Sequence, residues 1–277
     1  ICKTNMAKSI TKRTLVGFRN SKVNTRYFED LLNQITNKQS SFLVKIKQPS
    51  TFGKSNNNSI MKTVTHYSDT RGHVNHGWLQ ARHSFSFASF YNADRMNFGA
   101  LRVLNDDIVA PNMGFGAHPH DNMEIITIPL TGALKHRDSL ANQWQSVLPG
   151  EVQIMSAGKG IEHSEMNAST ETELKLFQIW IIPNKRDINP RYDQKFFFDR
   201  DRHNKFQTLV SSYDDDDTES LKIYQDVRLS RISLDKGRSV EYFLKSKCHG
   251  VYVMTIDGVS LINNTILKKR DAIGVSE

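Results

Sequence analysis

The chain has 277 residues, of which 24% are charged and 38% hydrophobic, a balance typical of a soluble globular protein with one large or two modest domains. It has no apolar run of the roughly 18–20 residues that a membrane-spanning helix needs and no apolar segment near its start that would indicate a secretory signal. Two cysteines are too few for a disulfide framework or a thiolate zinc site. We therefore expect a cytoplasmic protein with no membrane partner.

The net charge of +8 is confined to the N-terminal segment. Residues 1–60 hold 11 Lys and Arg against 2 Asp and Glu, whereas the rest of the chain holds 26 against 27. Residues 61–277 therefore carry no net charge that would attract DNA or anionic lipid, and we expect no nucleic-acid partner for them. We expect residues 1–60 to be a disordered basic extension or a non-native upstream segment, with a small basic binding module as the alternative.

From Met61 onward, short strand-like runs alternate with turns rich in Gly, Pro, Asn and Asp. No long helical pattern interrupts them. Many short strands at regular spacing indicate an all-β sandwich or barrel. The clearest runs before the first connector are 101–104, 124–130, 152–155 and 174–182.

A connector at residues 184–190 leads to a second β-rich stretch that continues to the end of the chain. Repetition of a β-rich block predicts two similar barrels, at 61–183 and 184–277. The second block contains only two histidines, His203 and His249, which are not clustered. We therefore expect metal chemistry in the first block alone.

The most informative feature is a pair of short motifs, His118-Pro119-His120 and His163-Ser164-Glu165. In a strand, residues two apart point to the same side. If the two strands lie side by side in a barrel, three imidazoles and one carboxylate converge inside it. Such a donor set suits a divalent first-row metal.

Glu124 is a second acidic candidate, because it lies four residues after His120 and shares its face if the strand continues unbroken. It could replace or join Glu165 as a ligand, act as a base, or form a salt bridge. Spacing alone does not decide between these roles.

Three histidines precede the two motifs in an aromatic-rich segment, where we expect them to seal one barrel end, with pocket lining as the alternative: His73, His76 and His83. His136 follows Lys135 and is expected on an exposed turn. Met113 and Phe115 flank a glycine-containing loop before His118 and are candidates for contacting an aromatic substrate.

Several longer motifs surround these residues: RGHVNHGWL (71–79), HSFSFA (83–88), ALRVLNDD (100–107), GFGAHPH (114–120) and MSAGKGIEHSE (155–165). They resemble the motifs of the pirin family, a branch of the cupin superfamily, and are most similar to those of the bacterial pirin-like proteins. The resemblance covers most of residues 62–277 and none of residues 1–60.

The resemblance implies a bicupin, in which two double-stranded β-helix (jelly-roll) barrels face each other and the N-terminal barrel holds one metal. Carried over by position, the ligands are His118, His120, His163 and Glu165. Glu124 occupies the usual cupin glutamate position, which in pirins is not normally counted as a ligand. Fe(II) is the metal that the family implies, while the donor set also admits Mn, Co, Ni, Cu or Zn.

The implied activity is that of a quercetin 2,3-dioxygenase, which opens a flavonol with O2 and releases carbon monoxide. In that reaction Glu165 or Glu124 would take the proton of the flavonol 3-hydroxyl. The alternative implied function is a non-enzymatic, iron-dependent regulator of the coregulator type, which binds a protein partner. We expect a monomer in either case.

The chain stops at Glu277, where family members continue with further strands. We therefore expect an incomplete C-terminal barrel with an unpaired edge.

Overall fold

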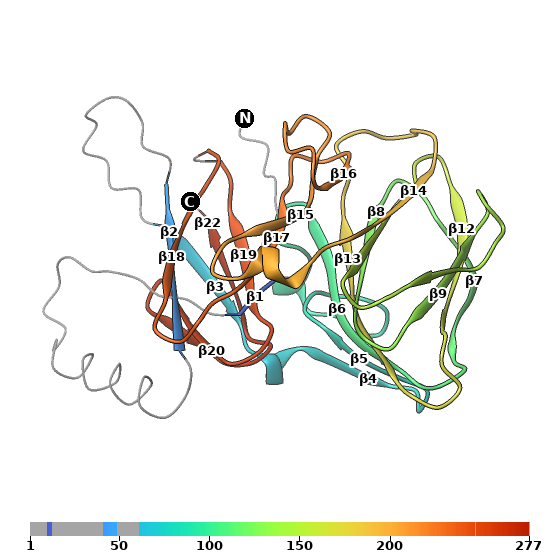
Figure 1. The fold of residues 1–277 in the computed structure, drawn as a ribbon, viewed down its shortest axis with the longest axis horizontal. Helices are drawn as coiled ribbons and strands as arrows, with labels where there is room; N and C mark the ends of the chain where they lie inside the picture. The colour runs from blue at the N-terminus through green and yellow to red at the C-terminus, as the bar shows by residue number, and fades with distance from the viewer. Residues whose placement is uncertain (1–9, 13–40, 49–60, 247, 277) are drawn as a thin grey trace, which may run out of the picture.

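The computed structural model describes residues 10–12, 41–48, 61–246 and 248–276. This part of the chain forms two β-barrels (Figure 1), which confirms the predicted all-β bicupin. Helix within it is limited to three short 3-10 turns: η1 (Ser68–Thr70), η2 (Ala93–Arg95) and η3 (Asp199–Arg202). None of the helical turns in the described ranges is long and apolar enough to cross a membrane.

The first barrel consists of a seven-stranded and a four-stranded sheet, and its strand pairings are antiparallel. The larger sheet has the order β14 (Arg191–Phe196), β11 (Glu151–Ser156), β8 (Glu124–Thr131), β13 (Leu174–Ile181), β6 (Leu101–Val109), β5 (Leu79–His83), β4 (Gly72–Asn75). The smaller sheet has the order β10 (Gln145–Val147), β9 (Leu134–Asp138), β12 (Ile161–Asn167), β7 (Gly114–His120).

The second barrel is also built from a seven-stranded and a four-stranded sheet. The larger sheet has the order β16 (Leu221–Ile223), β15 (Gln207–Ser212), β17 (Leu229–Ser233), β1 (Ile10–Lys12), β19 (Val251–Thr255), β22 (Ala272–Ser276), β3 (Lys62–His66). The smaller sheet has the order β18 (Ser239–Phe243), β2 (Ser41–Lys47), β20 (Val259–Ile262), β21 (Thr265–Leu267).

Most of the predicted basic extension, residues 1–60, lies outside the described residues. Its described parts are strands of the second barrel: β1 lies between β17 and β19, and β2 lies between β18 and β20, all in parallel pairings. Val44 and Ile46 of β2 are buried in the core of that barrel.

The structure does not confirm the expected incomplete C-terminal barrel. The last described strand, β22, is paired on both sides, with β19 and with β3. The expected unpaired edge is therefore not found at this strand, because a segment from the start of the first predicted domain covers it.

The two barrels exchange strands across the predicted domain boundary near residue 183. β3 precedes the first barrel in sequence but pairs with β22 of the second. β14 follows the boundary but pairs with β11 of the first. Each barrel thus includes a strand from the other side of the predicted boundary.

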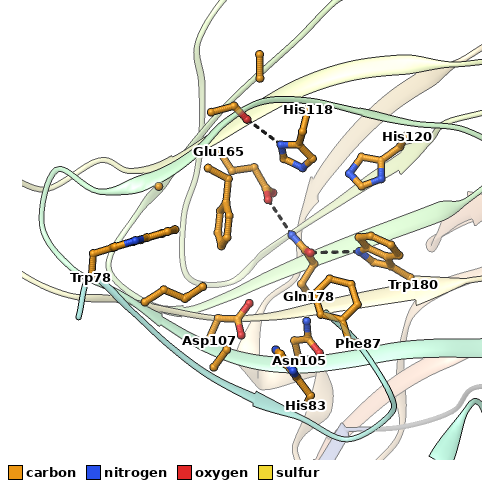
Figure 2. A pocket seen from close by; sticks show the side chains of 16 residues that line it. Trp78, His83, Phe87, Asn105, Asp107, His118, His120, Glu165, Gln178 and Trp180 are labelled. Carbon is orange, nitrogen blue, oxygen red and sulfur yellow. Dashed lines mark hydrogen bonds between the residues drawn. The ribbon is translucent and has the colours of Figure 1, made fainter. Parts of the chain in front are cut away.

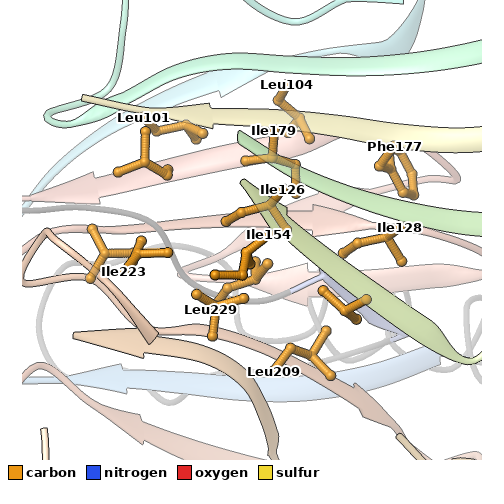
Figure 3. Close-up of a cluster of buried hydrophobic side chains, with 14 of the residues drawn as sticks. Leu101, Leu104, Ile126, Ile128, Ile154, Phe177, Ile179, Leu209, Ile223 and Leu229 are labelled. Carbon is orange, nitrogen blue, oxygen red and sulfur yellow. The ribbon is translucent and has the colours of Figure 1, made fainter. Parts of the chain in front are cut away.

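The largest hydrophobic core lies between the barrels (Figure 3) and contains residues of both. Ile126 and Ile128 of β8 pack there, together with Leu209 of β15 and Leu229 of β17. Strand β8 is buried on both faces because one face lines the first barrel and the other faces the second. This double burial explains its nearly continuous apolar sequence.

His66 at the end of β3 is a buried histidine in the second barrel. Its Nδ1 lies 2.9 Å from the Tyr252 hydroxyl, and its ring is 4% exposed. Burial lowers the pKa of His66 to about 4, with a smaller effect of Arg95 in the same direction.

A His66→Gln variant is expected to lose less stability in acid than the wild type. Above pH 6.5 the imidazole is neutral in both states, whereas between pH 6.5 and 4 only the unfolded chain takes up the proton. From pH 7 to pH 5 this linkage removes about 2 kcal/mol from the wild-type free energy of unfolding. Urea titrations at several pH values measure the free energy of unfolding of both proteins. The same dependence of this free energy on pH in the variant and the wild type would contradict the prediction.

Candidate metal centre

The two histidine motifs lie on neighbouring strands of the four-stranded sheet. Strands β7 and β12 pair antiparallel, and His118 is the direct register partner of His163. His120 lies two residues along β7, on the same face as His118. Between His163 and Glu165 the register shifts, because β7 contains one residue more than β12 there, which marks a bulge in β7.

Gly114 at the start of β7 permits this close pairing. A Cβ atom there would overlap the backbone of Glu165 and Met166 in β12. The structure therefore requires glycine at this position, as expected for a backbone that approaches its neighbour closely.

The three imidazoles converge through their Nε2 atoms. His163 Nε2 lies 2.9 Å from His118 Nε2 and 3.0 Å from His120 Nε2. Together these three residues form a group whose donor atoms could hold a metal ion. Two nitrogens bound at about 2.1 Å and at right angles are about 3 Å apart, so the observed separations fit one metal shared by all three.

Hydrogen bonds orient two of these rings. His118 Nδ1 donates to the Gly116 carbonyl at 2.8 Å, which leaves Nε2 as an acceptor. His163 Nδ1 lies 3.2 Å from His136 Nε2, and His136 Nδ1 lies 3.7 Å from Asp138 Oδ2. If His163 binds a metal through Nε2, its Nδ1–H donates to His136, so the carboxylate and the second imidazole fix the ring.

The expectation that His136 lies on an exposed turn is wrong. It lies in β9, is 1% exposed, and stacks on Tyr192 with ring centroids 4.9 Å apart. Sequence reasoning missed it because the alternation of β9 depends on where the strand begins. In the observed strand, Leu134, His136 and Asp138 alternate inward.

Burial keeps the His163 and His120 imidazoles neutral near neutral pH. It lowers the pKa of His163 to about 2, with the neighbouring His118, His120 and His136 acting in the same direction. It also lowers the pKa of His120 to about 4, again with a contribution from His118. Neutral imidazoles present the lone pairs that a metal ligand requires.

Glu165 is fully buried and lines the same cavity as His118 and His120. Its Oε2 accepts a hydrogen bond from Gln178 Nε2 at 2.7 Å (Figure 2). Its Oε1 accepts one from Thr127 Oγ1 at 3.4 Å. Burial raises the pKa of Glu165 to about 7. The carboxylate is not part of the group in which the three imidazole nitrogens converge, so its role as fourth ligand stays a prediction.

Glu124 lies neither in the imidazole cluster nor in the lining of the adjacent cavity, so its position does not support the predicted role as base or ligand. The turn before β8 includes Asn122 with a φ of 44°, so the alternation of β7 does not continue into β8. Glu124 shares the face of Ile126, which packs on the second barrel. Its carboxylate accepts hydrogen bonds from Ser156 Oγ at 2.6 Å and from the Tyr224 backbone N–H at 3.3 Å.

A cavity of about 530 Å³ opens beside the histidines (Figure 2). Phe115 lines it and packs edge-on against Trp78 at 5.3 Å. Met113, the other predicted substrate contact, is not among the lining residues. The aromatic and polar lining side chains are Trp78, Phe87, Phe115, Trp180, His83, Asn105, Asp107, His118, His120, Glu165 and Gln178.

Of the three upstream histidines, only His83 is buried and lines the cavity, whereas His73 and His76 are exposed. Sequence reasoning did not single out Asn105, Asp107 or Gln178. These residues alternate inward on β6 and β13, which was the only signal in the sequence. That alternation identifies them only when the bounds of the strands and the sheet that they face are known.

Two sequence families match the chain. The pirin family model matches residues 64–181, and a model described as the quercetinase C-terminal cupin domain matches residues 209–277. A quercetin 2,3-dioxygenase of Escherichia coli is 43% identical over 205 residues, which are 74% of this chain and 86% of that protein. A pirin-like protein of Caulobacter vibrioides is 44% identical over 209 residues, or 76% and 88% of the two chains.

Among solved structures, a bacterial pirin of Escherichia coli in complex with nickel(II) is similar, with a TM-score of 0.65 and 37% identity. The match covers 78% of this chain and 90% of that one. Fold and histidine cluster together define a bicupin with a candidate metal centre in its first barrel. The chain belongs to the pirin family.

Proposed function

We propose that this protein is a metal-dependent dioxygenase that opens flavonols by the quercetin 2,3-dioxygenase reaction. The observation that carries the proposal is the cavity of about 530 Å³, which has aromatic walls and two of the three converging histidines in its lining. A flat aromatic substrate fits such walls. Relatives named for this reaction support the choice.

His118, His120 and His163 would hold the metal, with Glu165 as the fourth ligand or as the nearby carboxylate. The convergence of the three imidazoles fits a divalent first-row ion, for which we propose Fe(II). Such an ion supplies a Lewis-acidic centre that favours the deprotonated 3-hydroxyl and a redox centre for reaction with O2.

The chain's own side chains bind and orient the flavonol. Trp78 and Phe115 form one aromatic contact, and Trp180 forms another with Phe87 at 5.2 Å. Gln178 accepts a hydrogen bond from Trp180 Nε1 at 3.2 Å and donates one to Glu165. This network links the aromatic wall to the carboxylate that we assign as acceptor of the 3-hydroxyl proton.

Iron-loaded protein is expected to consume quercetin under air and to release carbon monoxide. The decrease in flavonol absorbance measures quercetin consumption, and gas analysis measures carbon monoxide release. The control is free Fe(II) at the same concentration, since metal ions alone promote some flavonol oxidation. Flavonol loss no faster than in that control would remove the support for the proposed activity. Nothing in the described ranges favours the regulatory alternative.

A further inference from the structure

A row of polar side chains crosses the inner face of the seven-stranded sheet. His83, Asn105, Gln178, Thr127 and Gln153 are successive register partners on β5, β6, β13, β8 and β11. A polar row inside a barrel is unfavourable unless each group finds a partner.

Glu165 provides partners for the middle of the row, because Gln178 and Thr127 both donate to its carboxylate. The β6 side chains next to Gln178 lack such partners. Asn105 Oδ1 and Asp107 Oδ1, from adjacent inward positions of β6, are buried and have no hydrogen-bond partner in the protein. Their side chains are 2% and 4% exposed.

These two side chains lie on the opposite wall of the cavity from the histidines. Asn105 and Asp107 belong to the seven-stranded sheet, whereas His118 and His120 belong to the four-stranded sheet. Figure 2 places the two pairs on opposite sides of the cavity, with Gln178 between them. A ligand held at the histidines therefore extends toward the carboxamide and the carboxyl group.

We propose that Asn105 and Asp107 form a subsite that recognises hydroxyl groups on the rings of the flavonol remote from the metal. The inference rests on the proposed function and narrows its substrate class to polyhydroxylated flavonols. A phenolic hydroxyl can donate to the unpaired oxygen of either residue. A site that holds buried polar groups for a hydroxyl discriminates against an analogue without it, since the groups then stay unpaired.

The test is binding of two flavonols to the nickel(II)-loaded full chain without O2, so that no turnover is needed. Quercetin carries hydroxyls on both outer rings, whereas 3-hydroxyflavone keeps only the 3-hydroxyl and 4-carbonyl at the metal end. Quenching of tryptophan fluorescence reports binding, because Trp78 and Trp180 line the cavity. The wild type is expected to bind quercetin at least about tenfold more tightly.

Asn105→Val and Asp107→Val are made as separate variants, so that failure of one to fold leaves the other as a test. Valine suits these positions because Val103 and Val109 occupy the flanking inward sites of β6. In either variant the preference for quercetin is expected to fall below about threefold, through weaker quercetin binding, with 3-hydroxyflavone binding retained.

Gln153→Met is the matched control. Gln153 belongs to the same row, is buried and has both amide atoms unpaired, but it does not line the cavity. Its variant is expected to keep the wild-type preference. A preference that survives both valine variants would overturn the subsite alone. If neither flavonol binds the metal-loaded wild type, the proposed function fails together with the subsite.

Discussion

A His163→Ala variant is expected to bind a divalent first-row metal at least about 100-fold more weakly than the wild type and to lose flavonol turnover. The loss of a residue that only orients a ligand already lowers metal affinity about 10- to 100-fold, and removal of a ligand is more severe. His163 is the central member of the cluster, since its Nε2 lies within 3.0 Å of both other Nε2 atoms. Nickel(II) titration calorimetry measures the affinity.

His76→Ala is the control for this prediction, because it removes an exposed histidine from the same barrel. Its metal affinity is expected to match the wild type. Unchanged affinity in His163→Ala would place the metal elsewhere and would invalidate the proposed ligand set. The thermal melting curve of each metal-free protein separates loss of binding from loss of fold.

A Phe177→Ala variant is expected to be about 3–5 kcal/mol less stable than the wild type, as is typical of large truncations in a core. Phe177 is fully buried in the core shared by the barrels, and the Arg270 guanidinium lies 4.8 Å from its ring. Because the same core contains residues of both barrels, we expect both to unfold in one weakened transition. Urea denaturation followed by tryptophan fluorescence and by circular dichroism measures this.

Tyr91→Ala is the comparison, since Tyr91 is 74% exposed and its truncation is expected to change stability little. Two separate transitions in Phe177→Ala, with only one of them shifted, would contradict a shared core. A loss below about 1 kcal/mol would contradict the expected size of the destabilisation, because it would indicate that the site relaxes around the missing ring.

The histidine cluster is the part of the site that sequence alone predicts best. Residues two apart in a strand share a face, so the spacing within His118-Pro119-His120 and His163-Ser164-Glu165 places each pair together in any strand. The spacing does not state that the two strands are neighbours. The observed partnership of His118 with His163 is a property of the sheet.

Glu124 illustrates why spacing fails across a turn. Its separation from His120 is compatible with a shared face only if one strand contains both residues. Instead, the turn containing Asn122 separates the two strands, so the inward and outward alternation of β7 does not continue into β8. The Glu124 carboxylate accepts a hydrogen bond from the backbone N–H of Tyr224 in the second barrel. A local sequence pattern cannot predict a contact between residues so far apart in the chain.

The amino-acid pattern alone predicts an all-β chain, two same-face pairs (His118 with His120, and His163 with Glu165), and a resemblance to the pirin family. These properties depend on local patterns or on the sum of many of them, so periodicity and motif content are enough to predict them. The folded structure was needed to show that Glu124 faces the second barrel and that His136 contacts His163 from β9. It was also needed to show that Asn105 and Asp107 line the cavity opposite the histidines. Each of these depends on strand register between segments far apart in the chain, and a one-residue change of register moves every side chain to the other face.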